Sequence, residues 1–416
     1  MRIKAFAATA AGVMLFSSAA MADTTIHFLH LQENPGVIAL WTQIAKDFEA
    51  ANPGVHVELQ YLENEALKAK LPTMLQSSDK PNLFQSWGGG VLLDQYKAGV
   101  LQDVTAEAGD LEKEISAGPA SVYKIDDKIV GAPYLVSEVP FFYNKALFAN
   151  AGVKAEDIKT WDDLLGAVKK IKAGGTVPIC LGGGDKWPVH FYWSYLVLRA
   201  GGGNILAEAK ATKDGFKGPA FVEAGKKLKE LAALEPFQPG YLAAKFQEAS
   251  GLWGDGKCAM SLMGNWFLNT EADNAQDKKG QPIDNIGVFQ FPTLPGGKGA
   301  ATVTLGGADG NIVSKGSPPE TVKFLTFFEQ AKYQREAAAH GWYIPAALGT
   351  ADAITNPVLR SIAEDVAHST KHQLFFDQDL GASVGRVVND SSVAIAGGQM
   401  TPEQAADAVQ KAWDEK

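Results

Sequence analysis

The fold is decided by residues 25–61, which read TIHFLHLQENPGVIALWTQIAKDFEAANPGVHVELQY. Residues 25–30 contain Ile26, Phe28 and Leu29 and predict a short strand. One face of a following helix is then marked by apolar residues at helical spacing, namely Val37, Leu40, Trp41, Ile44 and Phe48. Asn52-Pro53-Gly54 ends that helix. From Val55 to Tyr61 apolar and polar residues alternate, so a second strand follows and the stretch is a strand–helix–strand unit with Trp41 in the core.

The same pattern recurs along the chain. Strands are predicted at Asn82–Trp87, Val177–Leu181 and Ala259–Met263, and each is followed by a turn that contains glycine and then by a helix. Strands that alternate with helices indicate parallel sheets covered by helices on both faces. Because no linker rich in proline or serine is present, we expect several ordered segments to cross between two open sheets.

Helix starts are marked by capping signals. Thr160–Asp163, Ser317–Glu320 and Thr401–Gln404 each fit the capping box, in which the side chains of the first and last residue satisfy each other's backbone N–H groups. The last 60 residues are predicted to be wholly helical.

Residues 1–22 have the features of a secretory signal peptide. Arg2 and Lys4 precede an apolar run, and Ala20-Met21-Ala22 fits a cleavage site. The run is too short for a transmembrane helix, which needs about 20 apolar residues. We therefore expect export to the periplasm and a mature chain that starts at Asp23, with no lipid anchor and no direct membrane insertion.

The charge balance excludes one class of partner. The formal net charge is −9 over 416 residues, and no dense cluster of lysine and arginine is present. An acidic surface repels phosphate backbones, so no nucleic acid is expected as a partner.

Two cysteines, Cys180 and Cys258, are the only ones in the chain. An oxidising compartment favours a disulfide. Counted from the glycine that follows each strand, however, the two residues are offset by about 13 Å at ~3.3 Å per residue. A disulfide needs Cα atoms within about 7 Å. We therefore expect free, buried thiols.

Polar and aromatic residues gather at the carboxyl ends of the predicted strands, where ligands bind in open α/β sheets. Tryptophan rings can cover the apolar faces of a sugar, while carboxylates, amides and histidine bind its hydroxyl groups. The mixture lacks a cationic cluster and suits a neutral polyhydroxylated ligand better than a phosphate. The candidate ligand-binding residues are Gln32, Glu33, Trp87, Gly88, Glu138, Asp185, Trp187, His190, Asn265, Trp266, Gly307, Asp309, Tyr343 and Asp377.

Several enzyme classes lack their motifs in this sequence. Gly182–Lys186 does not have the spacing of a phosphate-binding loop, and no GxGxxG, HExxH or GxSxG motif is present. His368 and His372 stand four residues apart, but we interpret them as a solvated helix face rather than a metal pair. No cofactor and no metal are therefore expected. A secreted glycoside hydrolase stays open as an alternative, since it needs only two carboxylates about 5 to 9.5 Å apart.

Taken in order, the motifs of this chain resemble those of the carbohydrate-binding subunits of ABC importers, the maltose-binding-like extracellular solute-binding family. The resemblance covers nearly all of the mature chain. Its carriers are Phe48–Gly54, Gly131–Tyr134, Phe142–Lys145, Thr160–Leu164, Gly256–Met260, Met263–Trp266, Tyr343–Pro345 and Ala396–Ala405.

The resemblance implies a two-lobed periplasmic-binding-protein fold of the α/β class, in which each lobe is a mostly parallel sheet flanked by helices. The first lobe would take residues 23–132 and 298–345, and the second would take residues 133–297 and 346–416. Hinge segments near Gly131–Pro133 would join them, and Trp266 would stack on sugar.

The implied function is capture of a neutral mono- or oligosaccharide between the lobes and delivery to an ABC permease, by a monomer that performs no chemistry. A polyol-binding receptor is an alternative of the same class.

Overall fold

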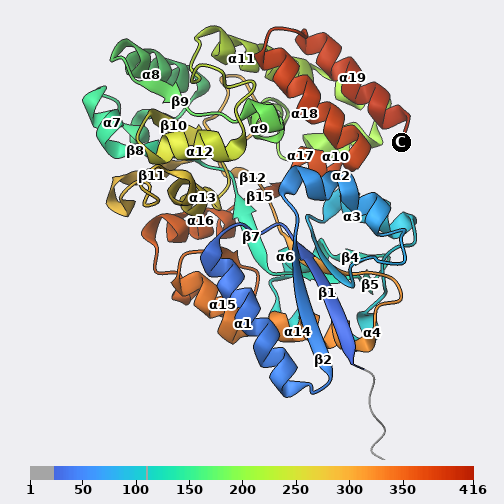
Figure 1. Cartoon of the computed structure of the whole chain (residues 1–416). Helices are drawn as coiled ribbons and strands as arrows, with labels where there is room; N and C mark the ends of the chain where they lie inside the picture. The colour runs from blue at the N-terminus through green and yellow to red at the C-terminus, as the bar shows by residue number, and fades with distance from the viewer. Residues whose placement is uncertain (1–22, 109–110) are drawn as a thin grey trace, which may run out of the picture.

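The computed structural model describes residues 23–108 and 111–416, so the predicted signal peptide lies outside the described residues. The chain is an α/β protein of two lobes, with a third sheet between them (Figure 1). No helix of the described part is both long enough and apolar enough to cross a membrane.

The first lobe contains a five-stranded sheet in the order β2-β1-β3-β13-β6. Its strands are β1 (Thr24–His30), β2 (Val55–Tyr61), β3 (Leu83–Ser86), β6 (Gly131–Pro133) and β13 (Gly310–Val313). Strand β1 pairs in parallel with β2 and β3, whereas β13 pairs antiparallel with β3 and β6. The predicted strand–helix–strand unit is confirmed, because α1 (Pro35–Ala51) buries the face that carries Trp41.

The second lobe contains a four-stranded sheet in the order β11-β8-β10-β9. Its strands are β8 (Phe141–Asn144), β9 (Val177–Ile179), β10 (Cys258–Leu262) and β11 (Ile286–Phe289). Strands β9 and β10 are parallel, and β8 is antiparallel to both of its neighbours. The sheets are therefore more mixed than expected. The strands next to the connections between lobes supply the antiparallel pairs.

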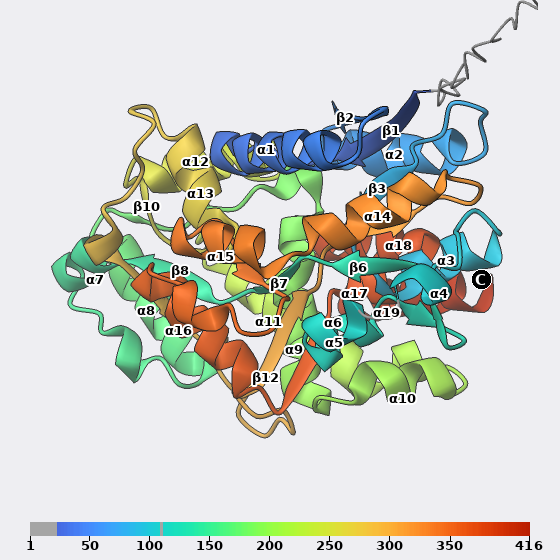
Figure 2. The same cartoon turned by 90° about the horizontal axis from the view of Figure 1, so that it is seen from below.

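A third sheet, in the order β14-β7-β12-β15, lies between the two lobes (Figure 2). It consists of β7 (Leu135–Glu138), β12 (Val303–Gly307), β14 (Ile344–Pro345) and β15 (Lys371–Leu374). Strand β7 continues from β6 and β12 leads into β13, so two stretches of chain run from this sheet into the first lobe. They are joined where the backbone N–H groups of Tyr134 and Leu135 donate to the Asp309 carbonyl.

Helices cover these sheets (Figures 1 and 2). In the first half of the chain they are α2 (Asn64–Met74), α3 (Gly89–Lys97), α4 (Thr105–Ala108), α5 (Leu111–Glu114), α6 (Ala117–Ser121), α7 (Lys145–Asn150), α8 (Trp161–Ala173) and α9 (Trp187–Gly201). In the second half they are α10 (Ile205–Ala211), α11 (Pro219–Ala233), α12 (Phe246–Gly254), α13 (Phe267–Asn274), α14 (Pro319–Phe328), α15 (Ala331–Ala339), α16 (Pro357–Ala367), α17 (Phe376–Asp379), α18 (Ala382–Ala396) and α19 (Pro402–Asp414).

Two of the three capping predictions are confirmed, since Thr160 and Thr401 each form a complete capping box. The third is wrong. Helix α14 starts after Pro318, and the Ser317 hydroxyl donates instead to the Asn82 carbonyl at 3.1 Å. The helical tail is also interrupted by β15, so His372 lies in a strand rather than on a solvated helix face, and burial lowers its pKa to about 4.

The prediction of two free thiols is wrong. Cys180 and Cys258 form a disulfide, with Cα atoms 5.6 Å apart. The predicted offset assumed that both cysteines lie in extended strands that end at one edge. Strand β9 ends at Ile179, so Cys180 follows the strand rather than lying inside it.

Candidate functional site

A cavity of about 620 Å³ lies between the lobes. The carboxyl ends of β1 and β3 and the starts of α1 and α2 contribute the first-lobe wall, while α9, α12 and α13 contribute much of the second-lobe wall. The lining residues are Leu31, Gln32, Glu33, Asn34, Pro35, Val37, Asn64, Lys68, Trp87, Leu135, Ser137, Trp187, His190, Phe191, Phe246, Gln247, Asn265, Trp266, Asn269, Thr270, Asp273, Asn274, Lys278, Asp309, Trp342, Tyr343, Phe375, Asp377 and Gln378.

Ten of the fourteen residues singled out from the sequence meet in this cavity. They are Gln32, Glu33, Trp87, Trp187, His190, Asn265, Trp266, Asp309, Tyr343 and Asp377. The other four, Gly88, Glu138, Asp185 and Gly307, do not line it. The fold therefore brings together predicted residues that are as much as 345 positions apart in the chain.

An aromatic cluster forms the second-lobe side of the cavity. The ring centroids of Trp187 and Trp266 lie 6.2 Å apart, and those of Trp266 and Phe375 lie 6.1 Å apart. Phe191 and Phe246 pack beside Trp187. These rings offer a broad, rigid apolar surface to a ligand.

Gly264 fixes the position of the Trp266 ring. A Cβ atom on this glycine would lie 2.0 Å from Cζ3 of the indole, so any larger residue would have to displace the ring. The predicted strand-end glycine therefore has a specific role in the site, because it lets the Trp266 indole lie against the backbone.

The first lobe contributes two more tryptophans. Trp87 follows β3, and the Lys68 ammonium lies 5.4 Å from its ring centroid. Trp342 stacks on His340 with centroids 4.5 Å apart. All four tryptophans of the cavity are half-buried, whereas Trp41, predicted to be plain core, is completely buried.

The loop after β1 is held by a hydrogen-bond network from the connection between lobes. The Gln32 amide donates to the Tyr134 hydroxyl oxygen at 2.8 Å, and the Gln85 amide donates to the same oxygen at 2.6 Å. Gln85 also accepts from the Leu31 N–H group. Since Tyr134 lies between β6 and β7, the position of Gln32 in the cavity is tied to the segment that links the lobes.

Two carboxyl groups of the cavity differ in environment. Glu33 accepts from the Tyr61 hydroxyl at 2.6 Å on an exposed edge. Asp309 lies deeper, and burial raises its pKa to about 7. A protonated carboxyl can donate as well as accept a hydrogen bond.

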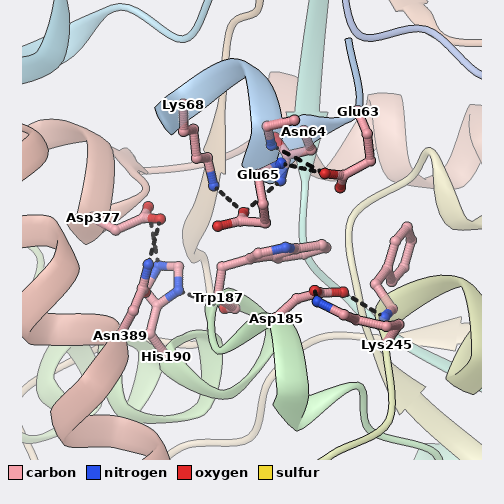
Figure 3. Close-up of polar contacts among 12 residues, drawn as sticks. Glu63, Asn64, Glu65, Lys68, Asp185, Trp187, His190, Lys245, Asp377 and Asn389 are labelled. Atoms are coloured by element: carbon pink, nitrogen blue, oxygen red, sulfur yellow. Dashed lines mark hydrogen bonds and ion pairs between the residues drawn. The ribbon is translucent and has the colours of Figure 1, made fainter. Parts of the chain in front are cut away.

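Glu138 and Asp185 support the cavity from behind it. The Glu138 backbone N–H donates to the Asn265 side chain, and the Asn265 N–H donates to the Glu138 carbonyl, both at 3.0 Å. The Glu138 carboxyl is not part of the cavity lining. It is completely buried, and burial raises its pKa to about 8. Asp185 accepts from the Lys245 ammonium at 2.6 Å and the Phe246 N–H at 2.7 Å, which anchors the start of α12 (Figure 3).

The two glycines are also supporting residues. Gly88 is the N-cap of α3 with φ +73°, and it follows Trp87 directly. Gly307 ends β12 beside the ring of Phe375.

The lobes contact each other across the cavity through side chains. Asn34 at the start of α1 donates to Asp273 of α13 at 3.0 Å. Asn269 of α13 donates to the Trp342 carbonyl at 2.9 Å, and Gln247 of α12 donates to Glu33 at 3.3 Å. The structure therefore has both lobes engaged over the cavity.

The charges of the cavity do not form a cationic cluster. Its two lysines have partners on the protein, because Lys68 pairs with Glu65 at 3.0 Å and Lys278 donates to the Asp273 carbonyl at 2.8 Å. Within residues 23–108 and 111–416, no group of three or more histidine, cysteine, aspartate or glutamate residues is arranged to hold a metal ion.

Sequence reasoning missed several lining residues. Trp342 directly precedes the predicted Tyr343, and Asn269, Thr270 and Asp273 follow Trp266 at intervals of three, four and seven residues. That spacing is one face of a helix, so extending the helical period from Trp266 could have found them. Lys68 and Asn64 come from α2, which carried no signal in the sequence.

Comparison with known proteins places the chain among binding proteins. Residues 34–335 match the family model described as bacterial extracellular solute-binding protein. Over 276 residues the chain is 28% identical to the multiple sugar-binding protein of Streptococcus mutans, a match that covers 64% of this chain and 61% of that protein.

Solved structures match over a greater length. A structure from work on xylan utilization by the thermophilic bacterium Caldanaerobius polysaccharolyticus gives a TM-score of 0.86 at 25% identity, covering 93% of this chain and 99% of that one. A chitin oligosaccharide binding protein gives a TM-score of 0.85 at 26% identity, covering 95% and 99%.

Proposed function

Because the chain belongs to the bacterial extracellular solute-binding protein family, we propose that it captures a neutral mono- or oligosaccharide in the cavity between its lobes and delivers it to an ABC permease. The names of the relative from Streptococcus mutans and of the chitin oligosaccharide binding protein support a sugar as ligand. We propose the ABC permease at the inner membrane as the partner because the chain belongs to this family.

One observation carries the choice of ligand. Four of the nine tryptophans line the cavity, together with carboxyl and amide groups and without a cationic cluster. Indole rings cover the C–H faces of a sugar, and the polar groups bind its hydroxyls. A phosphorylated ligand would need free cations, whereas both lysines of the cavity already have partners on the protein.

Closure of the lobes is the proposed mechanism. The first lobe takes residues 23–132 and 298–345, the second takes residues 133–297 and 346–416, and the segments around Tyr134 and Asp309 act as hinges. A sugar that contacts both lobes favours the closed form by the extra affinity it has for that form. The Tyr134–Gln32 hydrogen bond supports this coupling, since it joins a cavity residue to the hinge.

The location is proposed to be the periplasm. The predicted signal peptide supports export, and the Cys180–Cys258 disulfide is typical of an oxidising compartment. The protein acts as a monomer and catalyses no reaction.

A sugar screen tests this proposal. Thermal shift and calorimetry with xylobiose, N,N′-diacetylchitobiose, raffinose and polyols should identify a saccharide that binds and is recovered intact. Cleavage of the saccharide would favour the glycoside hydrolase instead, and binding of polyols alone would favour the polyol receptor. Absence of binding to every compound would refute the proposal.

A further inference from the structure

Two nearly buried side chains meet at the cavity wall beneath Trp187. His190 lies in the first turn of α9 and Asp377 lies in α17, with exposed side-chain fractions of 1% and 6%. The His190 Nε2 atom and the Asp377 Oδ1 atom are 3.5 Å apart. Figure 3 shows His190 and Asn389 converging on Asp377, with Lys68 of α2 on the opposite side. Both His190 and Asp377 line the cavity.

The hydrogen bonds around the pair fix the role of each atom. The His190 Nδ1 atom lies 2.6 Å from the Trp187 carbonyl, and a carbonyl only accepts, so Nδ1 carries the proton. A neutral imidazole has one N–H group, which makes Nε2 an acceptor. The Asn389 amide donates to Asp377 Oδ2 at 3.1 Å, which leaves Oδ1 facing Nε2.

Two acceptors therefore face each other without a donor. His190 Nε2 is buried and has no hydrogen-bond partner among the described residues. Protonation of Nε2 would supply a donor, but burial, the largest influence on this group, lowers the pKa of His190 and favours the neutral ring, and Lys68 acts in the same direction against the opposing effect of Asp377. An unpaired buried acceptor destabilises the protein, so a ligand that brings donors to this point is favoured.

We propose that His190 and Asp377 form a specificity-determining acceptor pair that binds two adjacent hydroxyl groups of the saccharide, one donating to His190 Nε2 and the other to Asp377 Oδ1. This assignment rests on the proposed function. Adjacent hydroxyls on a sugar ring provide two O–H donors at a spacing close to that of the two acceptors. Asn389 and the Trp187 carbonyl are positioning groups, since each holds one of the two acceptor side chains in place. Asn389 binds Asp377 Oδ2 and the Trp187 carbonyl binds His190 Nδ1, and neither of these two atoms is assigned to the ligand.

The test compares variants with deoxy sugars on the full mature protein. Whichever of xylobiose, N,N′-diacetylchitobiose and raffinose binds most tightly is titrated together with its monodeoxy derivatives. In His190→Gln and Asp377→Asn the Kd should rise at least tenfold. The deoxy derivative that lacks a recognised hydroxyl should bind the wild type at least tenfold more weakly than the parent sugar, and should lose little further affinity in the variant that lacks the matching acceptor.

Matched controls are available in the same residue types. His56→Gln changes an exposed histidine of β2, and Asp390→Asn changes the residue that follows Asn389 and pairs with Lys186. Both should bind sugar like the wild type. Melting temperatures report whether each variant is folded.

A second measurement does not depend on the variants. In the wild-type protein labelled with ¹⁵N-histidine, the His190 Nε2 resonance should have the position of an unprotonated nitrogen and should shift on addition of the sugar.

The outcomes separate this assignment from the proposed function. If a saccharide binds the wild type but no deoxy derivative is weakened, or if the Nε2 resonance does not shift, the acceptor pair is wrong while saccharide capture stands. Tighter binding of glucosamine than of the neutral sugar would also overturn it, because a cation rather than hydroxyls would then fill the site. If none of the three saccharides binds the wild type, the proposed function and this assignment both fail.

Discussion

Replacing Trp266 with alanine removes the indole at the centre of the aromatic cluster. The ring is half-buried, lines the cavity and lies next to Trp187 and Phe375, so part of the indole is exposed to a ligand. If a sugar ring covers roughly 50–100 Å² of that indole, about 25 cal/mol per Å² gives about 1–3 kcal/mol of binding free energy. The Kd should therefore rise roughly 5- to 150-fold.

Isothermal titration calorimetry measures this loss with the tightest-binding saccharide of the screen. Trp413→Ala is the matched control, because Trp413 is also half-buried but packs against Phe216 outside the cavity. Gly264→Ala should weaken binding in the same direction without removing the indole, since the new Cβ would displace the Trp266 ring. A folded Trp266→Ala variant whose Kd stays within twofold of the wild type would contradict a role for the Trp266 indole in binding the sugar.

Three further predictions follow from the contacts described above. Reduction of the Cys180–Cys258 disulfide opens a loop with a sequence separation of 78, so chain entropy predicts a loss of about 4–5 kcal/mol of unfolding free energy; urea unfolding with and without reductant measures it, and equal midpoints would contradict it. Burial raises the pKa of Glu138 and Glu271 to about 8, so the folded chain keeps protons that the unfolded chain releases, and stability should fall as pH rises toward 8. His30 and His372, whose pKa in the folded chain is lowered to about 4, act in the opposite direction until the unfolded pKa of about 6.5 has been passed, so the fall is measured above about pH 7.5. Glu138→Gln should reduce that slope by up to about 1.4 kcal/mol per pH unit and leave sugar affinity unchanged; an unaltered slope in thermal melts at several pH values would contradict this. Asp273→Ala removes the hydrogen bond from Asn34 across the cavity and should weaken sugar binding by about 0.5–1.5 kcal/mol; calorimetry checks it, and wild-type affinity would show that this contact does not stabilise the closed form.

Periodicity predicted the parts of the fold that depend on local burial. The spacing of Val37, Leu40 and Trp41 identified α1, and alternation identified β2, because each element has one face toward the core. Strand β15 was missed for the same reason. Its residues Lys371–Leu374 show no apolar alternation, and the segment is a strand only because it pairs with β12.

The cavity residues were predictable as far as they follow strands. Trp87, Asn265 and Trp266 lie where the strand-end rule places a ligand, whereas Glu138 ends β7 in the structure but has its carboxyl buried outside the cavity lining. Whether the side chain of a strand-end residue points into the cavity depends on tertiary packing, which a single sequence does not reveal. The cysteine pair failed for a related reason, because its geometry depends on where the chain leaves β9.

The most direct measurement of the central claim is a calorimetric titration of the mature wild-type protein with xylobiose, N,N′-diacetylchitobiose and raffinose, followed by chromatography of the recovered sugar. We expect one-to-one binding of at least one of these saccharides, with the sugar returned intact. No heat of binding with any of them, or recovery of cleaved sugar, would contradict the claim that the two lobes capture a saccharide without chemistry.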